Sequence, residues 1–138
     1  MAYSHLFIDS DVLLDLLFDR KPFSEFTKLL IAESSIRNIK LSTSTLIIAN
    51  INYIHSKKTD NLITRETLKK LIRIINVLPF ESDIITFALN SSFLDFEDAI
   101  QFYIAERYQC DAIVTRNIKD YKQSTIPVLN AEQFLRTL

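Results

Sequence analysis

The chain has 138 residues, 48% hydrophobic and 24% charged, which is the balance of a globular protein and predicts a single domain over residues 1–138. Sixteen basic and 17 acidic side chains leave a net charge of −1, which excludes a uniformly basic nucleic-acid-binding coat. Glycine is absent, which excludes the glycine-rich loops of Walker and Rossmann nucleotide-binding proteins. One cysteine and two separated histidines disfavour disulfide and zinc chemistry.

Hydrophobic residues are spread along the chain rather than collected in one long run. No apolar stretch approaches the roughly 20 residues that a transmembrane helix requires. Asp9 interrupts the N-terminal apolar stretch before the hydrophobic region of a signal peptide can develop. We therefore expect a cytoplasmic protein with no membrane partner.

The first half of the chain alternates predicted strands and helices. Apolar runs predict the strands, and apolar residues three and four apart predict the helices. Ser/Thr residues at 42–45 offer caps for a helix that carries Ile47 and Ile51 on one face, and Thr64 is the expected cap of the next helix. The predicted strands cover residues 3–8 and 40–42, and the predicted helices cover 12–18 and about 22–37. Two further helices are predicted, one that carries Ile47, Ile51 and Ile54 on one face and one that carries Leu68, Leu71, Ile72 and Ile75.

The second half continues the alternation. Ser82 is the expected cap of a helix that ends near Ser91, and Asn130 with Gln133 forms the pattern of a capping box for the last helix. Another helix is predicted over 96–108, and strands over 77–80, 112–115 and 126–129. Continuous apolar strands that alternate with helices predict an α/β sandwich with a largely parallel sheet. Ligands of such folds bind beyond the carboxyl ends of the strands.

Three remote segments each bring a carboxylate towards those strand ends. Asp9 directly follows the first strand, Asp98 lies in the first turn of a helix, and Asp120 follows the strand over 112–115. Each acid also has a local explanation, because Asp9 or Ser10 suits a helix cap and Asp120 suits a solvated turn. Carboxylates that converge within about 4 to 6 Å repel one another unless they protonate or bind a cation.

Carboxylate oxygens without a Cys or His cluster select Mg²⁺ or Mn²⁺ over zinc. Such an ion activates water and neutralises charge on a phosphodiester, so the acids favour phosphoryl chemistry. Basic charge is concentrated elsewhere, on the predicted helix that carries Arg65, Lys69 and Arg73 at intervals of four residues. This basic stripe is a candidate RNA-binding surface or simply a solvated helix face.

Three blocks of the sequence, in order, resemble PIN-domain nucleases, in particular the VapC-like toxins of bacterial toxin–antitoxin pairs. They are FIDSDVLLDLLFDRKPF, DFEDAIQFYIAE and DAIVTRNIKDY, and the likeness spans essentially the whole chain. The resemblance implies a PIN-like three-layer α/β/α sandwich with a central, mainly parallel sheet of four or five short strands. It also implies a Mg²⁺- or Mn²⁺-dependent ribonuclease, commonly a homodimer, that a small cognate antitoxin inhibits.

Carried over by position, the resemblance makes Asp9, Asp98 and Asp120 the metal-binding and catalytic acids. Thr115 and Asn117 match polar residues of the family's T-R-N segment. Arg116 is also assigned to the site, where it either holds the RNA backbone or forms an ion pair with one of the acids. Phe23, Phe26 and Tyr53 are candidates for an antitoxin groove or a dimer surface, or else for the core.

Two positions depart from the family pattern. Asp11 stands where the family usually has Asn, and it adds a carboxylate to the predicted metal site. Asn50 stands where the family has a Glu, and a neutral amide ligates a metal only through its oxygen and cannot act as a general base. An alternative is therefore a PIN-fold module that binds RNA or a protein but cleaves weakly.

A second alternative is a phosphatase of the haloacid dehalogenase type. In that class the first Asp of a D-x-D motif attacks phosphorus and the second acts as the acid, which corresponds here to Asp9 and Asp11. Thr43 would then supply the hydroxyl of that family. The expected Lys ahead of a later acid pair is not evident, and the T-R-N segment is left unexplained.

Overall fold

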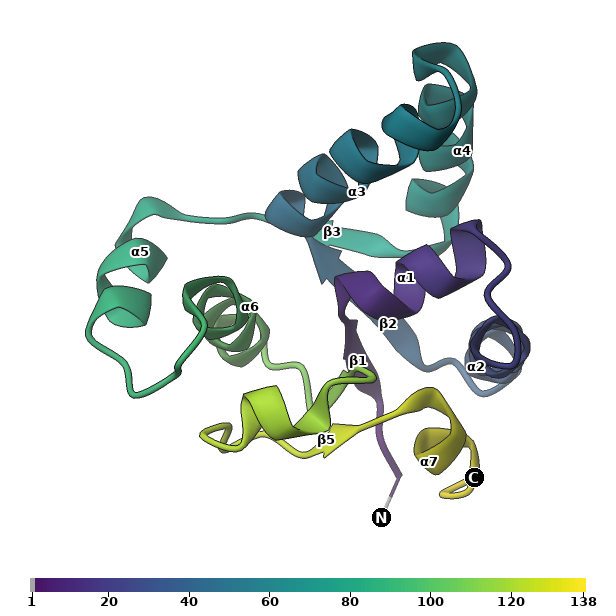
Figure 1. The fold of residues 1–138 in the computed structure, drawn as a ribbon. Coiled ribbons are helices and arrows are strands. Elements are labelled where there is room, and N and C mark those ends of the chain that lie inside the picture. The colour runs from purple at the N-terminus through teal and green to yellow at the C-terminus, as the bar shows by residue number, and fades with distance from the viewer. Residues whose placement is uncertain (1) are drawn as a thin grey trace.

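A five-stranded sheet, parallel throughout, forms the centre of the molecule, as Figure 1 shows. The computed structural model describes residues 2–138. The strand order is β3-β2-β1-β4-β5. The strands are β1 (His5–Ile8), β2 (Lys40–Ser44), β3 (Asn76–Leu78), β4 (Ala112–Val114) and β5 (Val128–Leu129). The helices are α1 (Ser10–Leu17), α2 (Phe23–Ile36), α3 (Thr45–Lys58), α4 (Asn61–Ile74), α5 (Ser82–Leu89), α6 (Phe96–Arg107), the 3₁₀ helix η1 (Ile118–Tyr121) and α7 (Ala131–Leu135).

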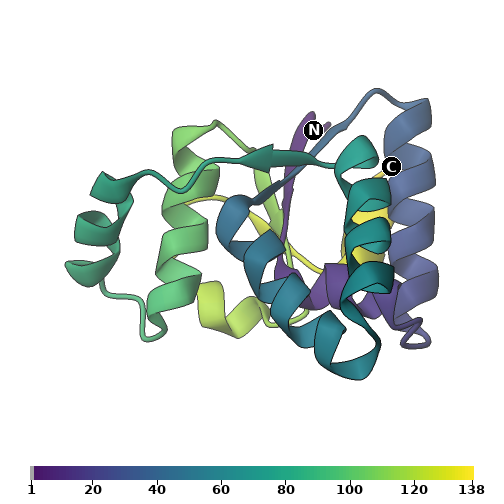
Figure 2. The ribbon, with the colours of Figure 1, turned by 90° about the horizontal axis from the view of Figure 1, so that it is seen from above.

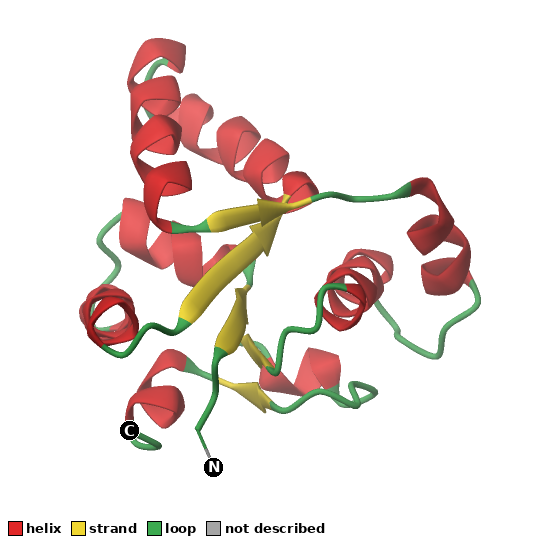
Figure 3. Ribbon diagram, turned by 180° about the vertical axis from the view of Figure 1, so that it is seen from behind, coloured by secondary structure: helices red, strands yellow, loops and turns green. Residues whose placement is uncertain are grey.

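Helices cover both faces of this sheet. Seen from above, α5 and α6 lie on one side of β1, and α1, α2 and α4 lie on the other (Figure 2). The view from behind shows the strands running in one direction between these helical layers (Figure 3). The structure confirms the predicted α/β/α sandwich, with a sheet that is entirely rather than mainly parallel.

The core follows from the apolar strands. Leu6, Phe7 and Ile8 of β1 are at most 1% exposed because helices cover both faces of the central strand. Helix α6 is buried on several sides, since Ala99, Ile104 and other apolar residues face the sheet while α5 packs on the helix from outside. Within residues 2–138, every helix is too short or too polar to cross a bilayer.

Two expected helix caps are wrong. Asp60, rather than Thr64, caps α4, because its carboxylate accepts the Ile63 N–H at 2.9 Å. Thr64 is instead buried and lies 2.7 Å from His55 Nδ1, so a tertiary contact uses its hydroxyl. Helix α5 begins after Glu81 and not after Ser82, and the cap residue makes no side-chain hydrogen bond.

Other predicted elements are present with shifted ends. The first strand begins at His5 rather than Tyr3, and β5 is limited to two residues. Helix η1 was not expected from the sequence, which shows no helical periodicity there. The capping box of Asn130 and Gln133 is confirmed, with both reciprocal hydrogen bonds present.

The strand order reverses between β1 and β4, which is where folds of this kind form a binding crevice. The chain moves from β1 outwards through β2 to β3, then crosses through α5 and α6 to β4 on the other side of β1. Adjacent strands at such a reversal send their following loops in opposite directions and leave a gap at their carboxyl ends. Ile8 pairs with Val114, so the next residues, Asp9 and Thr115, meet at this reversal.

Candidate active site

Asp9 lies at the centre of the acidic cluster. Its Oδ1 accepts the Ser10 N–H at 2.8 Å and so caps α1, while its Oδ2 accepts hydrogen bonds from Thr115 Oγ1 and Tyr121 Oη, both at 3.0 Å. The side chain is buried. Burial and the neighbouring charge of Asp11 raise the pKa of Asp9 to about 6, although all three hydrogen bonds favour the carboxylate. Capping therefore does not exclude Asp9 from the cluster, because it uses only one oxygen and the other lies among Thr115 and Tyr121.

Asp11 shares a hydroxyl group with Asp9. Thr115 Oγ1 lies 3.2 Å from Asp11 Oδ2 and 3.0 Å from Asp9 Oδ2, and its single proton can serve only one of them at a time. The Arg116 backbone N–H donates to Asp11 Oδ2 at 2.9 Å. Burial raises the pKa of Asp11 as well. Two carboxylates from the start of α1 thus lie beside one buried threonine.

Asp98 joins the cluster from the other side of the crevice. It lies in the first turn of α6, and Asp95 caps this helix by accepting the Glu97 N–H at 2.7 Å. Burial raises the pKa of Asp98 to about 7, and the negative charges of Asp95, Asp9, Asp120 and Asp11 add to the effect in that order. The four acids predicted for the site therefore lie close enough together for their charges to interact.

Asp120 is the most exposed member of the cluster. It lies on η1, and with Asp95 and Lys119 it lines a cavity of about 230 Å³ between the start of α6 and the residues after η1. Its charge reaches Asp98, but it makes no side-chain hydrogen bond within residues 2–138. Asp120 is therefore free to move towards a bound ligand.

Tyr121 was not expected in the site. The ring is 1% exposed and its hydroxyl donates to Asp9, so it fixes the orientation of the central carboxylate. Burial and the charges of Asp9 and Asp98 raise its pKa, which keeps the hydroxyl protonated and donating. The only sequence signal was its position next to Asp120, since an aromatic residue in a loop usually indicates packing.

The supporting residues divide into those that contact the cluster and those that do not. Thr115 is buried within the cluster, and Asn117 donates its backbone N–H to Thr115 Oγ1 at 3.1 Å. Asn50 lies on α3 beside the buried Ile47 and Ile51, and its side chain makes no hydrogen bond within residues 2–138. The structure therefore connects Thr115 directly to the acids and Asn117 to them through Thr115, while Asn50 makes no hydrogen bond to either within residues 2–138.

Arg116 forms the ion pair that was one of its two expected roles. Its Nε and Nη2 lie 2.7 and 3.0 Å from the carboxylate oxygens of Asp15, which is 1% exposed. Arg20 approaches the same carboxylate at 3.6 Å. Asp15 is thus neutralised by arginine, in contrast to the acids of the cluster.

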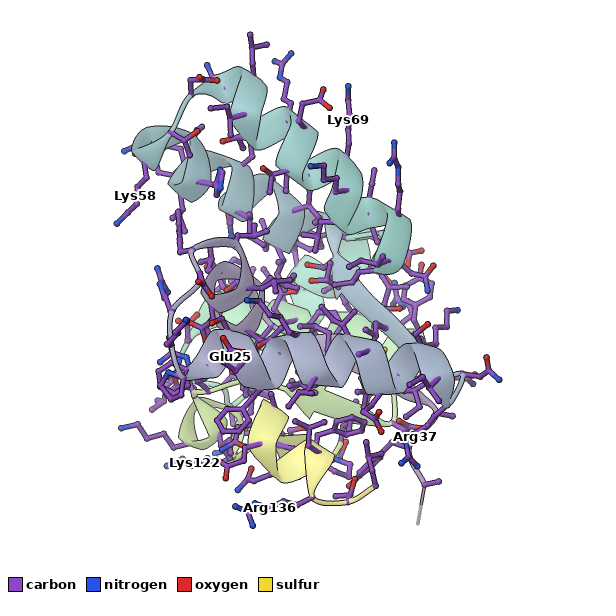
Figure 4. The ribbon with its side chains drawn as sticks, turned by 90° about the vertical axis from the view of Figure 1, so that its right-hand side faces the viewer. Glu25, Arg37, Lys58, Lys69, Lys122 and Arg136 are labelled. Atoms are coloured by element: carbon purple, nitrogen blue, oxygen red, sulfur yellow. The ribbon has the colours of Figure 1, made fainter. Side chains whose placement is uncertain are left out.

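The basic stripe lies elsewhere. Arg65, Lys69 and Arg73 are exposed on α4, which packs on α3 and β3, and Lys69 is 3.0 Å from Glu66 on the same helix. Figure 4 shows Lys69 pointing outwards from the surface of α4, whereas Lys58 and Lys122 project on another side of the molecule. The three aromatic candidates also differ, because Tyr53 is 62% exposed and Phe23 39% exposed, while Phe26 is half-buried against the core.

The donor set fits a hard divalent cation. It consists of carboxylate oxygens whose mutual repulsion a cation relieves, and Mg²⁺ typically takes one or two protein carboxylates and completes its shell with water and phosphate. Among residues 2–138, no three Asp, Glu, His or Cys side chains are already arranged to hold one ion. Direct ligation by two acids matches this arrangement better than a closed cage.

A parallel α/β sandwich with an acidic cluster at its strand reversal defines a class of proteins suited to metal-assisted chemistry on phosphate esters. Residues 5–119 match the family model described as PIN domain, and the chain belongs to this family. The phosphatase alternative is therefore wrong. The structure gives a physical reason, because Thr43 is fully buried and donates its hydroxyl to the Ile8 carbonyl at 2.9 Å.

Individual relatives agree with this assignment. The chain is 25% identical to ribonuclease VapC1 of Aquifex aeolicus over 139 aligned residues, which cover 97% of this chain and 95% of the relative. VapBC2 of Rickettsia felis, solved with a promoter DNA fragment, has a TM-score of 0.67 at 14% identity, covering 91% of this chain and 97% of the other. FitAcB of Neisseria gonorrhoeae has a TM-score of 0.72 at 13% identity, covering 92% and 98%.

Proposed function

We propose that this PIN-domain protein is a Mg²⁺- or Mn²⁺-dependent endoribonuclease and the toxin of a toxin–antitoxin pair. One observation carries the proposal. Asp9, Asp11, Asp98 and Asp120 come from three remote segments, and the negative charges of the other three raise the pKa of Asp98. A purely structural role would leave these acids paired with Lys or Arg, as Asp15 is. The similarity to a relative named as a ribonuclease supports RNA as the substrate.

Asp9 and Asp98 would hold the divalent ion, with Asp11 and Asp120 acting through water. When bound, the ion lowers the pKa of a water molecule and neutralises charge on the phosphodiester in the transition state. Thr115 and Tyr121 hold the Asp9 carboxylate in place through their hydroxyl groups. The Arg116 backbone N–H holds Asp11 in the same way. These contacts fix the acids before substrate arrives.

Contacts to the RNA backbone would come from basic side chains outside the cluster. Arg65, Lys69 and Arg73 supply three cations on one face of α4 and would set affinity rather than chemistry. Because α4 packs on α3 and β3, a substrate that contacts both the stripe and the acids would extend beyond the cluster. RNA in the cytoplasm is the expected target.

Protein partners follow from the related complexes. Structures similar to this chain include a VapBC complex of Haemophilus influenzae and a toxin–antitoxin complex of Klebsiella pneumoniae. By this likeness we propose a cognate antitoxin and a homodimer as the partners of this chain. Exposed apolar residues, among them Leu94 and Leu89, offer surface for such contacts.

A second candidate function is a PIN module that binds RNA or a protein and cleaves it poorly. The observation that favours it is Asn50, which is neutral where the family has Glu and which makes no hydrogen bond to the acids within residues 2–138. The four remaining carboxylates favour the active enzyme, because Asp11 returns the negative charge that Asn50 lacks.

The test separates cleavage from binding. Purified protein is incubated with labelled single-stranded RNA and Mn²⁺, and cleavage and affinity are measured for the wild type, Asp9→Asn and Lys69→Ala. We expect Asp9→Asn to reduce cleavage at least a hundredfold and leave affinity nearly unchanged, since Asn also caps a helix. Lys69→Ala is expected to weaken binding and flatten its salt dependence.

Glu106→Gln is the matched control, because it removes an exposed carboxylate from α6, the helix that carries Asp98. It should cleave like the wild type. Equal loss of affinity in Asp9→Asn and Lys69→Ala would contradict the proposed separation of roles, and unimpaired cleavage by Asp9→Asn would overturn the metal site.

A further inference from the structure

A cavity of about 330 Å³ opens beside the acidic cluster. It lies between α1, the start of α2 and the start of α7, and its walls include Val12, Phe23 and Phe26. Arg116 and Asn117 also line it, and they directly follow Thr115 of the cluster, just as Val12 directly follows Asp11. The same two chain segments therefore form the acidic cluster on one side and this cavity on the other.

Two flat side chains line the cavity and stack on each other. The Arg116 guanidinium lies 4.2 Å from the centre of the Phe23 ring, and Asp15 fixes its plane through two hydrogen bonds. Phe23 nevertheless remains 39% exposed. Aromatic rings and arginine planes are the surfaces on which unpaired RNA bases stack, and a plane fixed in advance loses little conformational freedom on binding.

The cavity also presents hydrogen-bonding groups without partners. The Asn117 side chain is exposed and makes no hydrogen bond within residues 2–138, although its backbone N–H is fixed to Thr115. An amide offers both a donor and an acceptor, as the edge of a base requires. Glu132 at the rim is paired with Arg136 at 2.7 Å, which reduces its repulsion of a nearby phosphate.

We propose that this cavity binds an unpaired nucleobase of the RNA substrate, adjacent to the phosphodiester at the acidic cluster, and that Phe23, Arg116 and Asn117 select this base. The proposal rests on the proposed ribonuclease function. Arg116 covers one face of the Phe23 ring, the base stacks on the opposite face, and Asn117 reads its edge. A nucleobase fits better than an apolar side chain of a protein, because the cavity pairs stacking planes with an unsatisfied amide and continues into the acidic cluster.

The experiment compares RNA with and without bases. Fluorescence anisotropy measures binding of a mixed-sequence RNA decamer and of a decamer of abasic ribose phosphates. The proteins are Asp98→Asn, to prevent cleavage, and the same variant with Phe23→Ala or Phe87→Ala. We expect Phe23→Ala to weaken binding of the RNA decamer by about tenfold or more and to leave the abasic decamer unaffected.

Phe87→Ala is a close control, since Phe87 is also an exposed aromatic ring with an arginine, Arg107, 6.0 Å from its centre. It should change neither affinity. A second variant, Asn117→Ala, should alter the preference among the A, C, G and U homopolymers without loss of affinity for the abasic decamer, and this test does not depend on the packing of Phe23.

Three results would overturn the assignment of the cavity. They are equal weakening of both decamers by Phe23→Ala, no weakening of either, or an unchanged order of homopolymers in Asn117→Ala. Unchanged RNA binding is also the result expected if the cavity receives an apolar side chain of a partner protein. A wild type that cuts RNA while these variants have no effect refutes only the cavity, whereas a wild type that neither binds nor cuts RNA refutes the proposed function itself.

Discussion

Asp11 and Asp15 lie one turn apart on α1, yet their environments are opposite. Asp15 is almost fully buried and is neutralised by Arg116 and Arg20. Asp11 is less buried, receives only an N–H and a shared hydroxyl, and lies among other acids that raise the pKa of Asp98. An aspartate paired with arginine holds the fold together, whereas aspartates left together without a cation store a repulsion that a ligand can relieve.

The largest effect is expected from removing the paired aspartate. Asp15→Ala leaves two arginines without their common partner, and we expect the free energy of unfolding to fall by about 2 kcal/mol, less than for a fully buried pair because both arginines reach solvent. Urea unfolding at neutral pH measures it. Asp83→Ala, which removes an exposed partner of Arg107, should change stability far less. Equal effects of the two variants would show that burial is not what distinguishes Asp15.

Adding a divalent cation should stabilise the folded protein by binding to the acidic cluster that includes Asp11. At a Mn²⁺ concentration ten times its dissociation constant, the gain in unfolding free energy is about 1.4 kcal/mol, visible as a higher melting temperature. Asp98→Asn should reduce this gain, and Asn50→Glu should enlarge it by adding a charged ligand. Isothermal titration with Mn²⁺ checks the affinities directly. An unchanged Mn²⁺ affinity in Asn50→Glu would remove Asn50 from the site.

A smaller effect is expected from removing the charge of Asp98 in the absence of metal, because this relieves the repulsion among the acids. Because the pKa of Asp98 is about 7 in the folded protein and about 4 when unfolded, its ionisation opposes folding at pH 8 and not below pH 4. Asp98→Asn should therefore raise the unfolding free energy at pH 8 by roughly 1 kcal/mol, after allowing for solvent screening of a half-exposed carboxyl. This gain should shrink as the pH falls from 8 towards 4.

The measurement is urea unfolding in EDTA at several pH values, with Glu106→Gln as the control from the same helix. A gain that stays constant with pH would contradict the repulsion, because a change in helix propensity or packing does not titrate. Loss of stability at pH 8 would mean that Asp98 has a favourable partner in the folded state.

Local patterns in the sequence are enough to predict the α/β sandwich and most of its elements. Buried strands such as Leu6 to Ile8 are read from continuous apolar runs, and helices from apolar residues three and four apart, because both patterns are local. The acids Asp9 and Asp98 could be placed near strand ends for the same reason. Local patterns also led to a wrong prediction, because Thr64 is a suitable helix cap but its hydroxyl contacts His55 instead.

Which charges meet depends instead on how segments far apart in the sequence are folded together. Nothing in the spacing of Asp11, Asp15 and Arg116 states that Arg116 donates its backbone N–H to one aspartate and its guanidinium to the other. Tyr121 was equally invisible, because its bond to Asp9 spans 112 residues of sequence. The periodicity of apolar residues indicates which face of an element is buried. Electrostatic interactions depend instead on distances in space, and the strand order sets those distances.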